Sequence, residues 1–273
     1  MFGSLLFPRE EKDVYPLVVC FHGSMGWRGH HHEHIVNFLN AGIAVFRVHS
    51  FEARQVNSVV EDQMQVTLAS MISDAYNALI LLNNHPKIDP KRIAISGWSL
   101  GGSTSLYSAW EPLAAKLAPN GERFKAHLAF YPAAHIWTEE MSWSNAPILT
   151  LTGEIDDYTP PILIRKLSKA INENSGNINV IYYPDSHHAF DSIEPINYVA
   201  NAITAGERHS FIDKEGNLYF ENSEGKRFLL NEPNERISLF QESKNIKGAH
   251  LGVNWDTREK SMEDAVNFLL DNL

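Results

Sequence analysis

Residues 92–102 read Arg-Ile-Ala-Ile-Ser-Gly-Trp-Ser-Leu-Gly-Gly, a short apolar run followed by a Gly-x-Ser-x-Gly motif. The apolar run predicts a buried strand, and residues 103–110 after the motif are typical of a helix. A serine on a sharp strand-to-helix turn needs small residues two positions away on each side, which Gly97 and Gly101 provide. We therefore expect Ser99 to be a nucleophile on such a turn, rather than part of a chance motif in a glycine-bearing loop.

The same turn predicts backbone donors for an oxyanion. The helix after the serine directs its free N–H groups toward it, so Leu100 N–H is expected to be one donor. A second donor should come from the loop after an earlier strand, where residues 21–26 read Phe-His-Gly-Ser-Met-Gly. We expect Ser24 N–H in that role, with Met25 as the alternative. Met25 and Trp98 are also expected to line the substrate pocket.

Short apolar runs alternate with segments of helical period along most of the chain. This alternation indicates repeated βα units, hence an α/β fold with a mainly parallel central sheet and helices on both faces. The expected strands are residues 17–21, 43–48, 92–96, 127–131, 148–152 and 179–183. Helices are expected over residues 34–40 and 68–82, and a last helix should open at Asp256, with Glu259 at the spacing of a capping box.

Residues 205–248 break this alternation. Two segments rich in turn residues separate short alternating runs there, which indicates an inserted β-hairpin-like segment before the last helix. A lid, a dimer arm and a decoration all fit such a segment. We expect residues 1–273 to form a single domain that carries it.

The composition limits the class of protein. With 273 residues, of which 44% are hydrophobic, the chain can bury the core of one large α/β domain. A formal net charge of −10 argues against nucleic acid or an anionic membrane as a partner, because both need a positive face. Cys20 is the only cysteine, so no internal disulfide is possible, and we expect a cytoplasmic protein of undetermined oligomeric state. No targeting or membrane-spanning segment is visible, although a cleaved signal peptide stays an open alternative.

An acid and a base are expected at the C-terminal edge of the sheet, where open α/β sheets build their sites. Residues 153–160 follow one expected strand and supply the carboxylates. The candidate acids are Asp156, Asp157 and Glu154. The base should follow the acid in sequence. The candidate bases are the adjacent His187 and His188, which follow the last core strand.

Residues 29–34 read Gly-His-His-His-Glu-His. His30 and His34 have the i,i+4 spacing that could place two imidazoles on one face of a helix, as in a metal site. The segment lacks the His-Glu-x-x-His pattern of zinc enzymes, and it opens a predicted helix. We therefore expect a solvated helix start, with no metal and no organic cofactor.

The chain resembles the dienelactone hydrolase family of α/β hydrolases over nearly its whole length outside the insertion. Five blocks occur in family order, at residues 17–23, 47–54, 88–102, 153–160 and 188–191. The resemblance implies the α/β-hydrolase fold and cleavage of a small carboxylic ester or lactone through an acyl-enzyme. In that family the acid lies three residues after the glycine of a Gly-x-x-Asp block, which implies Asp156. The family histidine directly precedes Ala-Phe or Gly-Phe, which implies His188.

The chain also departs from the family pattern. It has Ser99 where the name-giving enzymes carry a cysteine, so esters or lactones in general are implied rather than dienelactone itself. The block around Arg54 reads His49-Ser-Phe, where the family usually has Asp-Ser-Phe, and Arg54 is followed by Gln55 instead of glycine. The Gly-Trp-Ser-x-Gly-Gly sequence is also similar to that of prolyl-oligopeptidase-type peptidases. A peptidase and a non-catalytic scaffold used for binding are therefore the alternatives.

Overall fold

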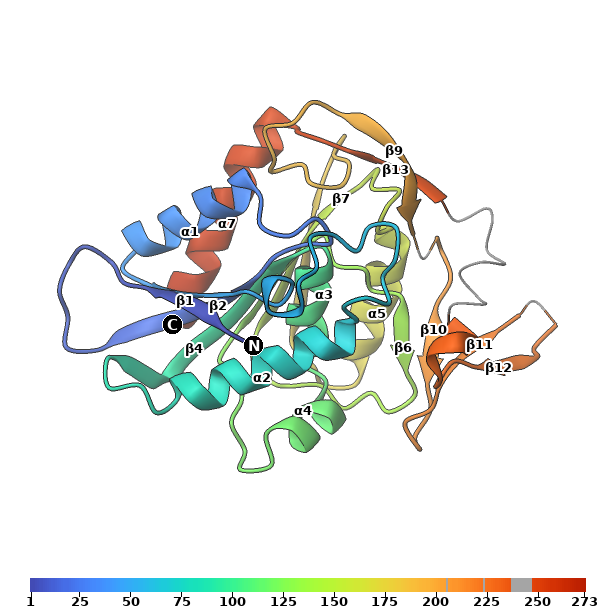
Figure 1. The fold of residues 1–273 in the computed structure, drawn as a ribbon, viewed down its shortest axis with the longest axis horizontal. Helices are drawn as coiled ribbons and strands as arrows, with labels where there is room; N and C mark the ends of the chain where they lie inside the picture. The colour runs from blue at the N-terminus through green and yellow to red at the C-terminus, as the bar shows by residue number, and fades with distance from the viewer. Residues whose placement is uncertain (205, 223, 237–246) are drawn as a thin grey trace.

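The computed structural model describes residues 1–204, 206–222, 224–236 and 247–273. Its centre is a seven-stranded sheet in the order β1-β3-β2-β4-β5-β7-β8 (Figure 1). These strands are β1 (Gly3–Leu6), β2 (Tyr15–Phe21), β3 (Ala44–Val48), β4 (Ile88–Trp98), β5 (His127–Phe130), β7 (Ile148–Gly153) and β8 (Ile178–Tyr183). Neighbouring strands pair in parallel except β1, which pairs antiparallel with β3 at the edge. The predicted α/β fold with a mainly parallel sheet is confirmed.

Helices cover both faces of this sheet (Figure 1). The helices are α1 (Gly29–Asn40), α2 (Leu68–Leu82), α3 (Leu100–Tyr107), α4 (Glu111–Leu117), α5 (Pro161–Glu173) and α7 (Trp255–Asn272). Successive side chains of a strand point to opposite faces. On β2, Val18 and Cys20 therefore join the core under α1 and α7, whereas Val19 and Phe21 join the core under α2, α3 and α5.

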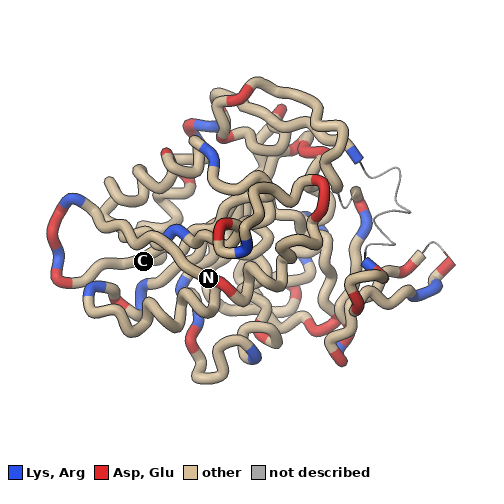
Figure 2. The backbone as a smooth tube through the Cα atoms, viewed as in Figure 1, with Lys and Arg blue, Asp and Glu red and all other residues tan. Residues whose placement is uncertain are grey.

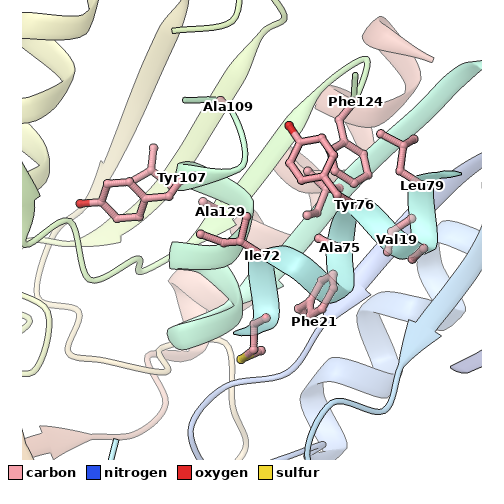
Figure 3. Close-up of a cluster of buried hydrophobic side chains, with 14 of the residues drawn as sticks. Val19, Phe21, Ile72, Ala75, Tyr76, Leu79, Tyr107, Ala109, Phe124 and Ala129 are labelled. Atoms are coloured by element: carbon pink, nitrogen blue, oxygen red, sulfur yellow. The ribbon is translucent and has the colours of Figure 1, made fainter. Parts of the chain in front are cut away.

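Helix α2 shows how one of these faces is built. Its apolar residues recur three or four positions apart, so one stripe of the helix packs on the sheet. Figure 3 shows Ile72, Ala75 and Tyr76 from this stripe beside Phe21 of the sheet and Phe124 of a neighbouring loop. The helix begins where Thr67 accepts a hydrogen bond from Ser70 N–H at 3.2 Å, as an N-cap residue does.

Two helix starts differ from the prediction. Helix α1 begins at Gly29, five residues before the expected start. Helix α7 is capped by Asn254, whose side chain accepts from Thr257 N–H at 3.2 Å. The predicted capping box that opens at Asp256 is therefore wrong. Asparagine is an equally good N-cap residue and lies two positions earlier, so Asp256 falls in the first turn instead.

The expected solvated start of α1 is also wrong. His30, His31 and His34 are buried, because the first turns of α1 pack against the end of the sheet. The ring of His34 lies 4.7 Å from Phe130 and 5.3 Å from Trp98 between ring centres. Polar residues in the first turns of a helix thus form part of the core here.

The predicted insertion, residues 205–248, follows β9 (Asn197–Ile203), and its last two residues belong to β13 (Lys247–Leu251). These two strands pair antiparallel as a ribbon. Within it, β10 (Ser210–Ile212), β11 (Leu218–Glu221) and β12 (Arg227–Leu229) join β6 (Ile136–Thr138) in a second sheet. Figure 1 shows this second sheet beside the main body, with the β9–β13 ribbon at another edge. Residues 237–246 of the predicted insertion lie outside the described residues.

Charged residues are spread over the whole backbone. Figure 2 shows lysines and arginines interspersed with aspartates and glutamates, not gathered on one helix or strand. Over the described residues, the helices are all too short or too polar to cross a lipid bilayer.

Buried histidines predict that the protein loses stability in mild acid. Burial lowers the pKa of His127 to about 4, and it lowers the pKa of His31 well below the usual value. In the unfolded chain both histidines titrate near 6.5. Below that pH the unfolded state therefore binds more protons than the folded state, and the free energy of unfolding falls. The stabilisation is complete above pH 6.5. It declines as pH falls toward 4, by roughly 2 kcal/mol between pH 7.5 and pH 5 for His127 alone. Urea unfolding at the two pH values measures this, and equal free energies of unfolding would contradict it.

Candidate active site

Ser99 lies on the turn between β4 and α3, in a backbone conformation with φ 56° and ψ −113°. A positive φ is uncommon for a residue with a side chain and marks a strained turn. The turn is tight because its glycines touch backbone. A Cβ on Gly97 would lie 2.2 Å from Gly101 O, and a Cβ on Gly101 would lie 2.2 Å from Phe21 O. The sequence requirement for small residues on both sides of Ser99 therefore has a direct structural cause.

Gly101→Ala should disrupt this turn. The added methyl group meets two backbone carbonyls, Phe21 O at 2.2 Å and His22 O at 2.7 Å, and neither can move without shifting β2. We expect a loss of roughly 2–4 kcal/mol in the free energy of unfolding, measured by chemical denaturation. Gly29→Ala is the matched control, because a Cβ at Gly29 meets nothing within 4 Å. Equal stabilities of the two variants would show that the turn tolerates a larger residue.

Three predicted residues meet at the C-terminal edge of the sheet. His188 Nε2 lies 2.8 Å from Ser99 Oγ, and His188 Nδ1 lies 2.8 Å from Asp156 Oδ2. Ser99 follows β4, Asp156 follows β7 and His188 follows β8. His188 and Asp156 are almost completely buried, whereas Ser99 is partly exposed. The arrangement is a relay from an accessible hydroxyl through an imidazole to a buried carboxylate.

The carboxylate of Asp156 is fixed by its own loop. Its Oδ1 accepts hydrogen bonds from the backbone N–H groups of Tyr158 and Thr159, each at 2.8 Å. Its Oδ2 accepts from Thr159 Oγ1 at 2.8 Å and faces His188. Sequence reasoning missed Thr159, because no local pattern reports that its hydroxyl turns back to the carboxylate of Asp156.

Asp157 points elsewhere and is bound to β13. Its Oδ2 lies 2.7 Å from His250 Nδ1, and its Oδ1 accepts from His250 N–H at 2.8 Å. Helix α5 has Pro160 at its N-cap position with no side-chain cap, so Asp157 does not cap that helix. Glu154 also stays exposed on the loop. Of the three candidate acids, Asp156 alone contacts the histidine.

Asp156→Asn should lower kcat for ester cleavage by on the order of 10⁴, because an amide favours the wrong tautomer of His188 and stabilises its cation poorly. Asp157→Asn, measured beside it, tests which aspartate matters. We expect the Asp156 variant to be at least about a hundredfold slower than the Asp157 variant in steady-state assays. The reverse order would assign the acid to Asp157.

The turn at residues 22–26 lies directly against the nucleophile. A Cβ on Gly23 would come within 3.3 Å of Ser99 Cβ, so the two turns are in close contact. Ser24 is buried in this turn, which is tied to the chain beyond β3 because Val59 N–H donates to Ser24 O at 2.8 Å. Leu100 is the first residue of α3, so its N–H has no partner within the helix. Both expected oxyanion donors therefore come from backbone close to Ser99.

The dienelactone hydrolase family model matches residues 2–212. The chain belongs to the dienelactone hydrolase family. Among solved structures, Thermogutta terrifontis esterase 2 phosphoramylated by tabun is similar, with 20% identity, a TM-score of 0.54, and coverage of 68% of this chain and 78% of that one. A protein of Klebsiella pneumoniae described as a dienelactone hydrolase is similar with 19% identity, a TM-score of 0.54, and coverage of 68% and 80%. Among curated proteins no sequence match was found.

One expectation that concerned the dienelactone hydrolase blocks turns out differently. Trp98 is fully buried, stacked 5.1 Å from Phe130 between ring centres, so it does not line a substrate pocket. The residue before the nucleophile points away from the site because successive strand residues face opposite sides. Met25 remains exposed on its turn.

Arg54 forms an ion pair with Asp74 of α2, with N–O distances of 2.7 and 3.1 Å, which fixes the chain after β3.

Asp191, three residues after His188, is a buried carboxylate to which the sequence interpretation assigned no role. Asp191 accepts hydrogen bonds from Trp98 Nε1 at 3.1 Å and Tyr131 Oη at 2.8 Å, and His34 Nε2 lies 3.0 Å away. Burial alone would raise the pKa of Asp191, but the facing histidines and Tyr131 lower it to about 2. Asp191 thus links the loop of His188 to the ends of β4 and β5 in this member of the dienelactone hydrolase family.

Aromatic rings complete the surroundings of the base. The ring centres of Tyr131 and Tyr158 lie 4.5 and 4.7 Å from that of His188. Tyr158 also packs against Val60, Ala202 and Ala249 in a small apolar cluster, so the β9–β13 ribbon covers the loop of Asp156. A surface hollow of about 490 Å³ next to this ribbon is lined by Asp156 and Asp157 but does not reach Ser99.

Proposed function

We propose that this protein is a serine hydrolase that cleaves carboxylic ester or lactone bonds through an acyl-enzyme, with Ser99 as nucleophile, His188 as base and Asp156 as acid. The observation that carries the proposal is the pair of 2.8 Å contacts that joins Ser99 Oγ to Asp156 through His188. These contacts give the hydroxyl a base that is itself oriented by a buried carboxylate.

Acylation begins when Ser99 Oγ attacks the ester carbonyl carbon and His188 Nε2 takes the hydroxyl proton. The carbonyl oxygen becomes an oxyanion, which accepts hydrogen bonds from the backbone N–H groups of Leu100 and Ser24. Collapse of this intermediate breaks the bond to the alcohol, which leaves with the proton from His188. The acyl group remains esterified to Ser99. In a lactone the alcohol stays attached to the acyl chain.

Deacylation uses the same groups in reverse order. Water attacks the acyl carbonyl carbon, His188 Nε2 takes its proton, and the second oxyanion is held by the same N–H groups. Expulsion of Ser99 Oγ, which recovers the proton from His188, releases the carboxylic acid. Asp156 holds the imidazole in the tautomer with Nε2 free to accept and stabilises the imidazolium in both steps.

The structural relatives agree with this chemistry. The esterase 2 of Thermogutta terrifontis has been solved with propionate bound, with butyrate bound and phosphorylated by paraoxon. Propionate and butyrate are short carboxylates, the class of product that ester hydrolysis releases. Such small ligands support a small acyl ester as the substrate class for this chain also.

A rate panel tests the proposal and separates it from the peptidase alternative. Acyl esters from acetate to octanoate, a γ-lactone and a prolyl peptide amide would be assayed with the wild type and with a Ser99 variant as blank. We expect ester or lactone turnover that is faster than amide turnover by orders of magnitude, because resonance stabilises the amide more than the ester and an amine is a much poorer leaving group than an alcohol. Amide cleavage at equal or greater rate would support a peptidase, and the absence of turnover with every compound would support a binding scaffold.

A further inference from the structure

A second cluster of side chains lies next to the proposed site without sharing any of its residues. It consists of Asp157, His187 and His250, and one donor atom from each lies within 4.8 Å of the other two. Asp157 follows the proposed acid in sequence and His187 precedes the proposed base, while His250 belongs to β13. Over the part of the chain that the structure describes, it is the only group of at least three such residues with this spacing.

Within this cluster, the buried Nδ1 of His187 has no hydrogen-bond partner among the described residues. Asp157 holds His250 through both its carboxylate oxygens, at 2.7 and 2.8 Å. The ring of His187 lies 5.2 Å from that of His250 between ring centres, at an interplanar angle of 32°. A buried polar atom without a partner costs free energy, so His187 Nδ1 indicates that something else binds there.

The donor set points to a class of ion. Two imidazole nitrogens and one carboxylate oxygen suit Zn²⁺ and its neighbours in the first transition row. They suit Mg²⁺ and Ca²⁺ poorly, because those ions prefer oxygen ligands alone. The side chains of Asp157 and His250 are 44% and 43% exposed, so an ion can enter and keep a water as its fourth ligand.

We propose that Asp157, His187 and His250 form a binding site for a divalent transition-metal ion such as Zn²⁺. The ion ties β13 to the two loops that carry Asp156 and His188. This inference does not rest on the proposed function, because the ligands are outside the relay and binding requires no turnover.

The position of β13 indicates what a metal ion at this site would stabilise. Gly252 N–H, just after β13, donates to His188 O at 2.9 Å, so the strand already contacts the backbone of the proposed base. His250 lies beyond residues 2–212, which the family model matches, so the site combines two loops within the matched region with a strand outside it. A metal ion there adds a cross-link between that segment and the core.

Calorimetric titration tests the proposal directly. Chelator-treated protein would be titrated with ZnCl₂, and binding of Co²⁺ would be followed by its visible absorption, which reports mixed nitrogen and oxygen ligands. We expect one saturable site, and we expect His187→Ala and His250→Ala each to weaken Zn²⁺ binding at least tenfold. His85→Ala is the matched control, because His85 lies outside the cluster and should leave the affinity unchanged. Absence of saturable binding, or equal affinity in wild type and both cluster variants, overturns the proposal.

Thermal unfolding supplies a readout that is independent of activity. An ion that binds only the folded state raises Tm as its concentration exceeds Kd. Zn²⁺ should therefore raise the Tm of the wild type by several degrees, while Mg²⁺ should not. Asp157→Asn keeps the shape of its side chain and should abolish the Zn²⁺ shift without a large change in Tm in the presence of chelator. A Zn²⁺ shift of full size in this variant counts against the site.

Discussion

Ser99→Ala lowers kcat/KM for a preferred acyl ester by on the order of 10⁶, because the relay loses the atom that forms the covalent bond. The expectation follows from the 2.8 Å contact between Ser99 Oγ and His188 Nε2. Methyl in place of hydroxymethyl leaves the positive φ of the turn and the packing of α3 unchanged, so the loss should be chemical. Initial rates with an unactivated alkyl ester, followed by titration of the released acid, together with the Tm of the variant, measure both effects.

The matched control for this variant is Ser142→Ala. Ser142 is an exposed serine outside the site, and its change should leave kcat/KM within about twofold of the wild type. A Ser99 variant that keeps more than a tenth of wild-type activity at unchanged Tm would show that another nucleophile performs the reaction. Esters with activated leaving groups should be avoided, since residual turnover from the oxyanion donors alone would be largest with them.

His188→Ala should cost a similar factor, on the order of 10⁶ in kcat, because Ser99 and His188 act as a unit. Its adjacent histidine offers an internal comparison. The ring of His187 lies beside that of His250 in β13, whereas His188 contacts Ser99 and Asp156. We expect the His188 variant to be at least about a thousandfold slower than the His187 variant when both are assayed with chelator present.

The result that would contradict this assignment is the opposite order of the two histidine variants. Unequal folding cannot produce the expected order by itself, provided that both variants show the Tm of a folded protein.

Much of the fold could be predicted because local pattern and tertiary role agree along the central sheet. Each expected strand is a short apolar run, and each lies within two residues of an observed strand except at the N-terminal end of β4, which begins four residues earlier. The edge strand β1 and the short β6 escaped prediction because they have only four and three residues, too few to form a distinct apolar run. The first turns of α1 were misread since buried histidines look polar in sequence, and only the packing against Trp98 and Phe130 buries them.

The site was predictable where the backbone dictates the residue. A Cβ at Gly97 or Gly101 would lie 2.2 Å from a backbone carbonyl oxygen, so both positions require glycine. The Gly-x-Ser-x-Gly motif therefore predicts the tight turn directly. The choices of Asp156 over Asp157 and of His188 over His187 came from family resemblance. Two adjacent residues of the same type cannot be distinguished by hydrophobic pattern or by position after a strand. The contacts of Asp191 and the approach of His250 to Asp157 join residues 60 to 157 positions apart, and no local sequence signal reports such distances.

The most direct measurement for the central claim is covalent labelling of the nucleophile. The protein would be incubated with a fluorophosphonate, its intact mass recorded, and the modified peptide sequenced by tandem mass spectrometry. We expect one adduct per chain, located on Ser99, with none on the Ser99→Ala protein and much slower formation on the His188→Ala protein. Failure of the folded wild type to react, or an adduct on another residue, would contradict the assignment of Ser99 as the activated nucleophile.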